Sequence, residues 1–311
     1  MTAKLLKSTA VFGALAASVA FANWHGNYWH SEGVTMSYLA MHASARTAAL
    51  SGAGVATPVR ASEVSRNPLA TAAATAPEFG VNQIIFAENT ADNYTSAYFV
   101  SPINKNLAWS AALDFLGYDG IEGRDENGFK TSDYGAYSWS LQGGFAFRDE
   151  HFLSSVTARF ATQTIDDETG FAFLGDIGGA YRVNKYFSFG ATLTNAGYAT
   201  EFADERETAP MALQAGVTGF VPIVDRWALR LSVDTYRRAN TDEHFLFGGE
   251  VLYAETLAFR MGYALRPDFD TESGLSCGLG LVFGMVVFDY GYAPRPALNG
   301  GNHHISLGLQ F

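Results

Sequence analysis

Apolar and polar residues alternate along most of the chain after residue 78. In the stretch YSWSLQGGFAF, residues 137–147, the large side chains fall on odd positions, and Ser, Gln, Gly and Ala occupy the even ones. The stretches LRLSVDTY (229–236), LAFRMGYAL (257–265) and MVVFDYGYA (285–293) repeat this arrangement. Because successive side chains of a strand point to opposite faces, the period of two predicts strands with one apolar and one polar face.

The same pattern predicts about fourteen strands. Most are longer than the ~5–6 residues common in globular proteins and approach or exceed the ~9–11 residues of a tilted membrane strand. The expected strands cover residues 79–88, 93–102, 107–117, 134–147, 152–164, 171–183, 187–196, 210–220, 227–237, 244–253, 257–265, 274–283, 285–293 and 303–311.

Two architectures suit such strands: a soluble sandwich, which buries the apolar face, and a membrane barrel, which turns it to lipid. The connections alternate between long ones, such as 118–133 and 197–209, and short ones, such as 148–151 and 254–256. Long loops at one end and short turns at the other are typical of outer-membrane barrels. We therefore predict an all-β fold, a transmembrane antiparallel up-and-down β-barrel over residues 79–311, in the bacterial outer membrane with both termini periplasmic.

The chain ends in the middle of a strand, with the sequence HHISLGLQF. Ile305, Leu307, Leu309 and Phe311 share one face of that strand. Pairing of the last strand with the first would remove the exposed edge that an open sheet would have. Phe311 is therefore expected to act as the C-terminal signal for the barrel assembly machinery.

Charged residues within the predicted strands fall on the polar face. This placement fits a barrel, since a basic residue facing lipid at mid-bilayer costs ~2–4 kcal/mol. We expect these charges to pair across the lumen and hold the barrel shape, with the lining of a ligand path as the alternative. They are Arg159, Asp176, Arg182, Arg230, Asp234, Glu250, Arg260 and Asp289.

The first 78 residues do not alternate. Lys4 and Lys7 precede an apolar run that ends in Ala-Phe-Ala, which predicts a secretory signal peptide over residues 1–22. Residues 23–78 then form an N-terminal segment rich in Ala and Gly. Because fourteen strands enclose more space than eight, we expect about residues 40–78 to fill the periplasmic mouth as a hatch. A leader that lies on the surface or stays flexible is the alternative.

Composition disfavours several functions. The net charge of −11 argues against nucleic acid as a partner, and the single cysteine, Cys277, excludes an internal disulfide. No catalytic, cofactor or metal site is expected: the only local Ser/His pair is Ser306 with His304, on an ordinary strand. The acidic run 166–168 fits a solvated loop, with a divalent-cation site as the alternative.

Several blocks of the chain resemble one known family. SARTAALSGAGVA (44–56) followed by RNPLA (66–70) is similar to the start of the PorV/PorQ-type proteins, and ATLTNAGYATEF (191–202) and FDYGYAP (288–294) resemble later blocks in the same order. The likeness covers nearly the whole mature chain. It points to a hatch whose turns contain Arg46, Gly52, Gly54, Asn67 and Pro68.

This resemblance implies a barrel like that of the FadL-type fatty-acid channels. It also implies a role in type IX protein secretion, in which the protein binds cargo C-terminal domains and passes them to secretion-system components. The alternative is a FadL-like conduit for long-chain fatty acids or other hydrophobic small molecules. That alternative predicts an apolar pocket under the loops 118–133 and 197–209, and a lateral opening near Gly143-Gly144 or Gly178-Gly179. A passive structural barrel that partners a larger envelope complex is a third hypothesis.

Overall fold

The computed structural model describes residues 33–87, 93–125, 127–200, 208–266, 274–295 and 300–311. The expected signal peptide, residues 1–22, lies outside the described residues.

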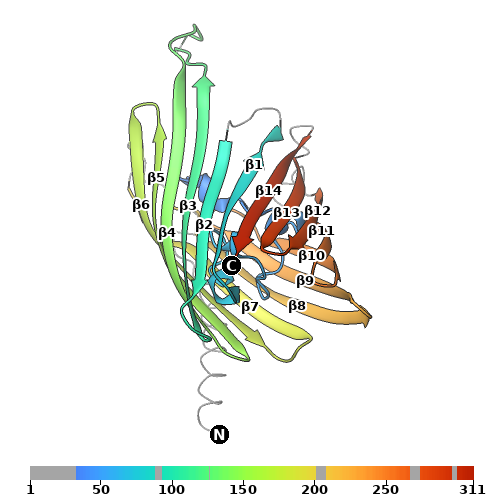
Figure 1. Cartoon of the computed structure of the whole chain (residues 1–311). Helices are drawn as coiled ribbons and strands as arrows, with labels where there is room; N and C mark the ends of the chain where they lie inside the picture. The colour runs from blue at the N-terminus through green and yellow to red at the C-terminus, as the bar shows by residue number, and fades with distance from the viewer. Residues whose placement is uncertain (1–32, 88–92, 126, 201–207, 267–273, 296–299) are drawn as a thin grey trace.

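Long antiparallel strands make up most of the molecule (Figure 1). They are β1 (Glu78–Ile85), β2 (Asn93–Pro102), β3 (Leu107–Ile121), β4 (Tyr134–Arg148), β5 (Phe152–Ile165), β6 (Glu168–Arg182), β7 (Phe187–Ala199), β8 (Ala212–Val224), β9 (Trp227–Arg238), β10 (His244–Tyr253), β11 (Leu257–Leu265), β12 (Gly274–Phe283), β13 (Val286–Arg295) and β14 (Gly300–Gln310).

The strands form one closed barrel in which each strand pairs with its neighbours in sequence. The barrel closes where β1 pairs with β14, from Glu78 opposite Gln310 to Ile85 opposite His303. The amide of Phe311 then donates to the carbonyl of Pro77 at 3.0 Å. This closure confirms the predicted fourteen-stranded antiparallel barrel, in which β1 and β14 leave no exposed edge.

The two faces of the barrel wall differ as the alternation predicts. Large apolar side chains point outward and are exposed, among them Phe145 (64%), Met261 (55%) and Leu231 (50%). Most inward positions carry small, polar or charged residues, and a few, such as Leu116 and Leu174, are large and apolar. An exposed apolar belt around a closed barrel, with polar groups inside, is the arrangement that lipid requires, since water would penalise the belt.

The two ends of the barrel also differ. The turns 149–151, 183–186 and 254–256 lie at one end, called here the short-turn end, and the β3–β4 loop 122–133 lies at the other, called the long-loop end. One connection corrects the sequence reading: Ile165 pairs with Glu168, so only Asp166 and Asp167 form the turn, and Asp166 takes a positive φ of 52°. The acidic run is therefore a tight hairpin turn, with Glu168 already part of β6, and is not an open loop.

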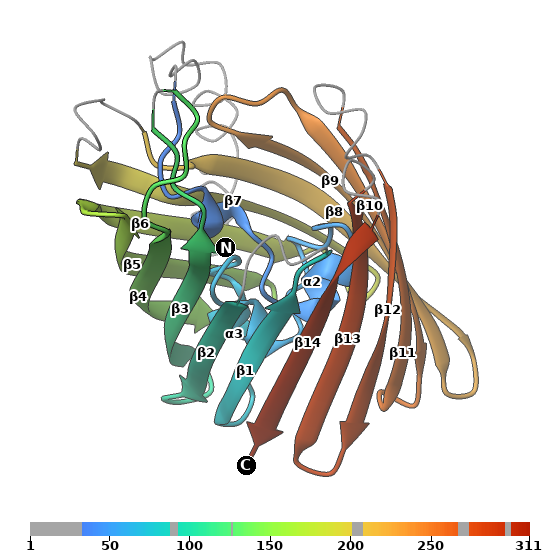
Figure 2. The same ribbon diagram turned by 90° about the horizontal axis from the view of Figure 1, so that it is seen from above.

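Residues 33–77, called here the interior segment, lie inside the barrel (Figure 2). The segment holds four short helical turns: η2 (Ser37–Ala40), α2 (Ala45–Ala49), η3 (Ala61–Glu63) and α3 (Ala70–Ala73). No helix in the described part of the chain has the length and apolar character needed to cross a membrane.

The interior segment extends further than the sequence predicted. At the long-loop end the amide of Thr35 donates to the carbonyl of Thr208 at 3.0 Å. At the short-turn end the guanidinium of Arg148 donates to the carbonyl of Ala72 at 3.1 Å. The expected hatch at one mouth is thus a segment that runs through the whole lumen. Its small residues allow this course, because they let its backbone approach the wall closely.

The outward apolar face makes a direct prediction. Replacing Met261, at the middle of β11, with Arg should lower the free energy of unfolding in lipid bilayers by ~2–4 kcal/mol, because the guanidinium would face hydrocarbon. Leu257→Arg, on the same face but at the end of the same strand, is the matched control and should cost ~0–1 kcal/mol. Denaturant titration of the two variants in vesicles measures both, and equal costs would contradict a lipid-facing belt.

Candidate functional site

A buried cluster of charges lies in the lumen around Glu250 of β10. Its carboxylate accepts hydrogen bonds from three arginines: Arg46 Nη2 to Oε1 at 2.5 Å, Arg230 Nη1 to Oε1 at 2.8 Å and Arg260 Nε to Oε2 at 3.0 Å. Arg46 and Glu250 are 1% and 2% exposed. Because the two residues belong to the interior segment and the wall, this bidentate pair ties one to the other.

The cluster continues on both sides of Glu250. Arg46 Nη1 donates to Glu63 Oε1 of η3 at 2.9 Å, and Arg260 Nη1 donates to Asp289 Oδ1 of β13 at 2.7 Å. Arg60 Nε lies 3.2 Å from Asp289 Oδ2. A guanidinium is not deprotonated in proteins, so Arg46 is charged where it is buried and needs its two carboxylate partners.

A second buried pair lies on the opposite wall. Arg159 Nη2 of β5 is 3.3 Å from Asp176 Oδ2 of β6 and donates to the carbonyl of Ser65 at 2.7 Å. The other oxygen of Asp176 accepts the amide of Asn195 at 2.6 Å. Nearby, Ser65 Oγ donates to Asp114 Oδ1 of β3 at 3.0 Å. The interior segment is thus bonded to strands on both sides of the lumen.

The turn after α2 docks on Asp234 of β9. Gly52 and Gly54 have φ values of +91° and +109°, a region that side chains with a Cβ rarely adopt. This conformation directs the amides of Gly54 and Val55 at Asp234 Oδ2, at 2.8 and 2.9 Å. Gln214 Nε2 donates to the same oxygen at 2.7 Å. The Gly-x-Gly pattern therefore builds a backbone site for a wall carboxylate.

Glycines of the wall form a flat seat for α2. Gly262, Gly278 and Gly291 lie on the adjacent strands β11, β12 and β13, and a Cβ added to any of them would collide with the helix or the turn after it. Their neighbours in α2 include Ala45 and Ala49. Close approach of two backbones requires this absence of side chains. Together with the Glu250 cluster, the seat fixes α2 against the wall.

The last predicted turn of the segment begins α3. Asn67 Oδ1 accepts the amide of Leu69 at 3.1 Å, a local bond that starts a helical turn, and Pro68 occupies the position between them. Leu69 is fully buried and packs toward Gly178 of β6. This turn lies near the short-turn end.

The structure places the eight predicted lumen charges on the inward register of their strands. Seven are buried or half-buried and bonded as described above, and Arg182 lies exposed at the short-turn end. Sequence reasoning missed Arg60, Glu63 and Asp114. Asp114 shares the inward parity of β3, which would have identified it, whereas Arg60 and Glu63 lie in a segment with no period to follow.

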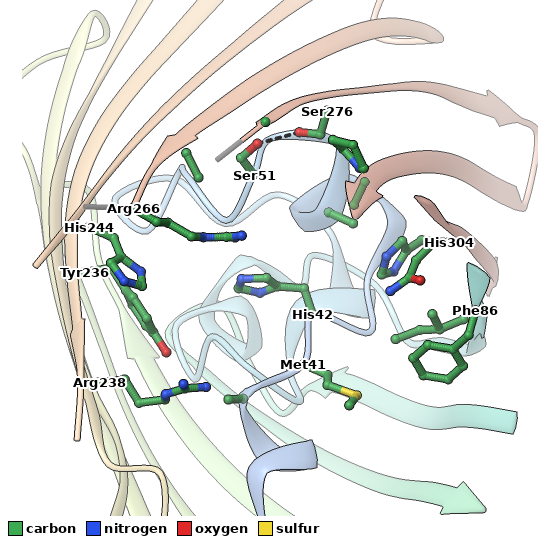
Figure 3. Close-up of a pocket in the computed structure, with 18 of the residues that line it drawn as sticks. Met41, His42, Ser51, Phe86, Tyr236, Arg238, His244, Arg266, Ser276 and His304 are labelled. Atoms are coloured by element: carbon green, nitrogen blue, oxygen red, sulfur yellow. Dashed lines mark hydrogen bonds between the residues drawn. The ribbon is translucent and has the colours of Figure 1, made fainter. Parts of the chain in front are cut away.

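A cavity of about 330 Å³ lies above α2, near the long-loop end of β9–β14, and is called here the vestibule (Figure 3). Arg266, His42 and Arg238 point into this space from the wall and the interior segment. The floor includes Ser51, whose hydroxyl lies 2.6 Å from that of Ser276. The vestibule is more polar than the expected pocket and lies on the other side of the lumen.

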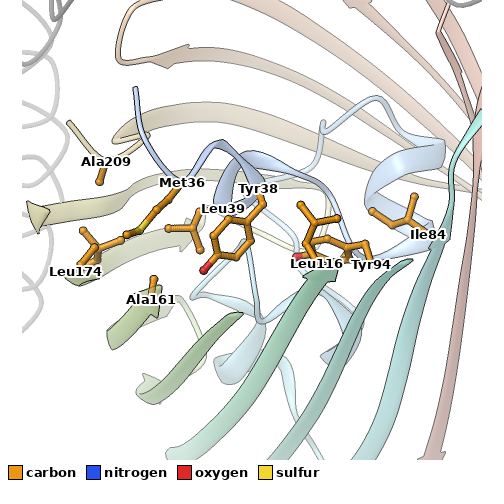
Figure 4. Packing of buried hydrophobic residues seen from close by; sticks show 11 residues of the cluster. Met36, Tyr38, Leu39, Ile84, Tyr94, Leu116, Ala161, Leu174 and Ala209 are labelled. Atoms are coloured by element: carbon orange, nitrogen blue, oxygen red, sulfur yellow. The ribbon is translucent and has the colours of Figure 1, made fainter. Parts of the chain in front are cut away.

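The space inside β3–β6, where the conduit hypothesis placed an apolar pocket, is filled by the chain itself (Figure 4). Met36, Tyr38 and Leu39 pack there against wall residues that include Leu116 and Leu174. Tyr38 Oη donates to the carbonyl of Trp139 at 2.7 Å, and Met36 adopts a positive φ of 53°. The expected apolar surface is present, but this part of the interior segment, called here the η2 strap (residues 36–41), occupies it.

The outer wall carries a groove of about 690 Å³ over β3–β7. Small residues create it: Ala111, Gly143, Ala158, Gly175 and Ala196. The pairing of β6 with β7 shifts register between Gly175 and Ile177, so the ladder is interrupted at this point. Leu174 lines the groove and also belongs to the apolar cluster around the η2 strap.

Ser306, the serine of the local Ser/His pair in the sequence, contacts the interior segment. Ser306 Oγ donates to Asn82 Oδ1 at 2.6 Å and accepts the amide of Ala45 at 2.9 Å, so it anchors the interior segment. Within the described ranges, no three His, Cys, Asp or Glu residues come together as metal ligands would.

The Glu250 cluster makes a testable prediction about the interior segment. Arg46→Met keeps most of the buried volume but removes one partner of a buried charge pair, so it should lower the free energy of unfolding by about 3–5 kcal/mol. It should also speed trypsin cleavage at Arg60 and Arg66. Arg124→Met, which removes an exposed pair with Glu122, is the control and should cost less than about 1 kcal/mol. Unchanged stability of Arg46→Met would contradict the anchoring role.

Comparison with known proteins matches this architecture to a group of solved structures. No protein-family model matches the chain, and no curated relative matches it either. The P. putida toluene transporter TodX is similar in structure, with a TM-score of 0.60 and 11% identity over 86% of this chain and 98% of that one.

Two further structures show the same likeness. The Ralstonia pickettii toluene transporter TbuX has a TM-score of 0.57 and 15% identity over 86% of this chain and 98% of that chain. A Pseudomonas aeruginosa FadL homologue has a TM-score of 0.51 and 12% identity over the same shares. At these identities the likeness concerns the fold: the chain adopts the fourteen-stranded barrel of the FadL-like proteins.

Proposed function

We propose that this protein is an outer-membrane channel for small hydrophobic molecules. The observation that carries the proposal is the apolar cluster on the inner side of β3–β6, which backs directly onto an apolar groove on the outer side of the same wall. The shared fold with two toluene transporters and a FadL homologue supports it. The long-loop end would face the outside of the cell, and the short-turn end the periplasm.

The proposed route runs sideways through the wall. If the η2 strap moved aside, the space inside β3–β6 would become an apolar chamber (called here the chamber). A hydrophobic molecule could pass from the chamber into lipid without exposure to water, whereas the polar lumen below would penalise it. Leu174 faces the chamber, and the register shift next to it weakens the ladder between β6 and β7. Gly143 and Gly175 remove side chains from the groove outside. The predicted opening near Gly143 is part of this proposal.

In this proposal the η2 strap is the gate. It fills the chamber that a hydrophobic molecule would need, and Met36 holds a backbone conformation that costs energy in a residue with a side chain. By contrast, α2 is held by buried charges and by the glycine seat. Displacement of the strap alone would open the chamber and leave the rest of the interior segment in place.

The secretion role implied by the PorV/PorQ resemblance remains a second proposal. It rests on the ordered sequence blocks alone, and its partners would be cargo C-terminal domains and components of the type IX system. Deleting the gene and measuring the surface proteome tests it. Accumulation of cargo in the periplasm would support secretion, whereas normal export would leave the channel as the better proposal and also fits a passive structural barrel.

Filling the outer groove tests the channel. Gly143→Leu places a branched side chain where the wall is now smooth, so uptake of radiolabelled toluene by cells that express the protein should fall severalfold. Gly219→Leu is the matched control, because Gly219 also faces outward, on β8, away from the groove. Heat-modifiable gel migration confirms that both variants fold. Equal uptake by the two variants would contradict the lateral route.

A further inference from the structure

The vestibule above α2 differs in chemistry from the space inside β3–β6, which the apolar side chains of the η2 strap fill. Two arginines and three histidines line it: Arg238, Arg266, His42, His244 and His304. Among the described residues that line it there is no Asp or Glu. This composition is unexpected in a chain whose net charge is −11. The described lining therefore offers an anion two guanidinium groups.

The basic side chains reach the vestibule from separate elements. Arg238 ends β9, His244 begins β10, Arg266 follows β11, and His304 lies on β14. His42 comes from the interior segment, and Gly52 leaves it room, since a Cβ there would lie 2.9 Å from His42 Nε2. Figure 3 shows Arg266, His42 and Arg238 directed at the same open space. Convergence of donors from five segments is typical of a binding site with a defined ligand orientation.

One side of the vestibule is apolar. Met41, Ile84 and Phe86 line it, together with Ala264 and Pro294. The ligand should therefore combine an acidic group with a compact apolar body. A volume of about 330 Å³ lies at the lower end of the ~300–1,000 Å³ typical of ligand pockets, which favours a compact ligand.

The floor of the vestibule is closed. Ala48 and Ser51 of the α2 region form part of it, and α2 is anchored by the Arg46–Glu250 pair and seated on Gly262, Gly278 and Gly291. Since nothing can pass below without breaking these contacts, the vestibule binds a molecule and does not conduct it. This separates it from the lateral route proposed above.

We propose that the vestibule is a binding site for compact organic acids, with the carboxylate held by Arg238 and Arg266 and the apolar body packed against Met41 and Phe86. This binding is independent of passage through the wall. A free small acid fits better than the acidic headgroup of a lipid, because the site lies inside the barrel and has no room for acyl chains.

The test measures binding to the full chain in lipid nanodiscs by fluorine NMR. The probe is 4-fluorobenzoate, and 4-fluorobenzyl alcohol is its neutral counterpart. Charge-assisted hydrogen bonds contribute about 1.5–3 kcal/mol, so the acid should bind at least about tenfold more tightly than the alcohol. The double variant R238Q/R266Q should lose this preference. R182Q, at the opposite mouth, should keep it.

Several outcomes would overturn the proposal. They are equal affinity for acid and alcohol, full acid binding by R238Q/R266Q, or binding of inorganic phosphate as tight as that of 4-fluorobenzoate. Equally tight binding of dodecanoate would overturn the restriction to compact acids and would indicate a lipid-derived ligand. If R238Q/R266Q fails to migrate as a folded barrel, R238Q alone gives the same comparison, because Arg238 is only half-buried.

The result is separable from the channel proposal. Acid binding with unchanged toluene uptake in Gly143→Leu cells would support the vestibule and overturn the lateral route. Loss of uptake in that variant, with no acid preference in the wild-type chain, would support the lateral route and overturn the vestibule proposal.

Discussion

A closed barrel of fourteen strands encloses more space than its inward side chains can fill, and the rest of this structure depends on how that space is occupied. Most inward positions of the wall carry small, polar or charged residues, because its large apolar side chains are mainly turned to lipid. An ordinary apolar core therefore cannot form across most of the lumen. The interior segment fills the lumen in two ways. Its charged side chains pair with opposite charges of the wall, and its small residues pack against small residues of the wall.

The Arg46–Glu250 contact shows what this solution requires. Moving a guanidinium and a carboxylate out of water is costly, and the cost is offset only when both are fully bonded. Glu250 meets this condition with three arginines, and Arg46 meets it with two carboxylates. The interior segment is thus specified by charge position as well as by volume, which explains why a stretch rich in Ala and Gly adopts one course through the barrel.

The lumen is divided into regions of different chemistry as a consequence. On the β10–β13 side, α2 is fixed by the charge cluster and the glycine seat, and a basic vestibule remains above it. On the β3–β6 side, the η2 strap packs through apolar contacts around Leu174 and a few hydrogen bonds to strand carbonyls. Apolar packing of a short strap is easier to displace than buried ion pairs, so the two sides are suited to different roles.

Much of this protein follows from its sequence alone. The period of two determined the strands, their order and their inward and outward faces, because each depends only on neighbours along the chain. It also determined which strand charges face the lumen, including Glu250 and Arg260. Closure was predictable from the even strand count, because an antiparallel barrel closes only when its first and last strands run in opposite directions.

Only the tertiary structure decided what occupies the lumen. Residues 33–77 have no period, so neither their course to the long-loop end nor the pairing of Arg46 with Glu250, 204 positions away, can be read from local pattern. The same reason explains the misplaced pocket: the conduit hypothesis expected an apolar pocket under the loops 118–133 and 197–209, and no local pattern predicted that Met36, Tyr38 and Leu39 would fill the space inside β3–β6. Contacts between residues distant in the chain depend on how the barrel closes in space, and a local sequence pattern does not contain this information.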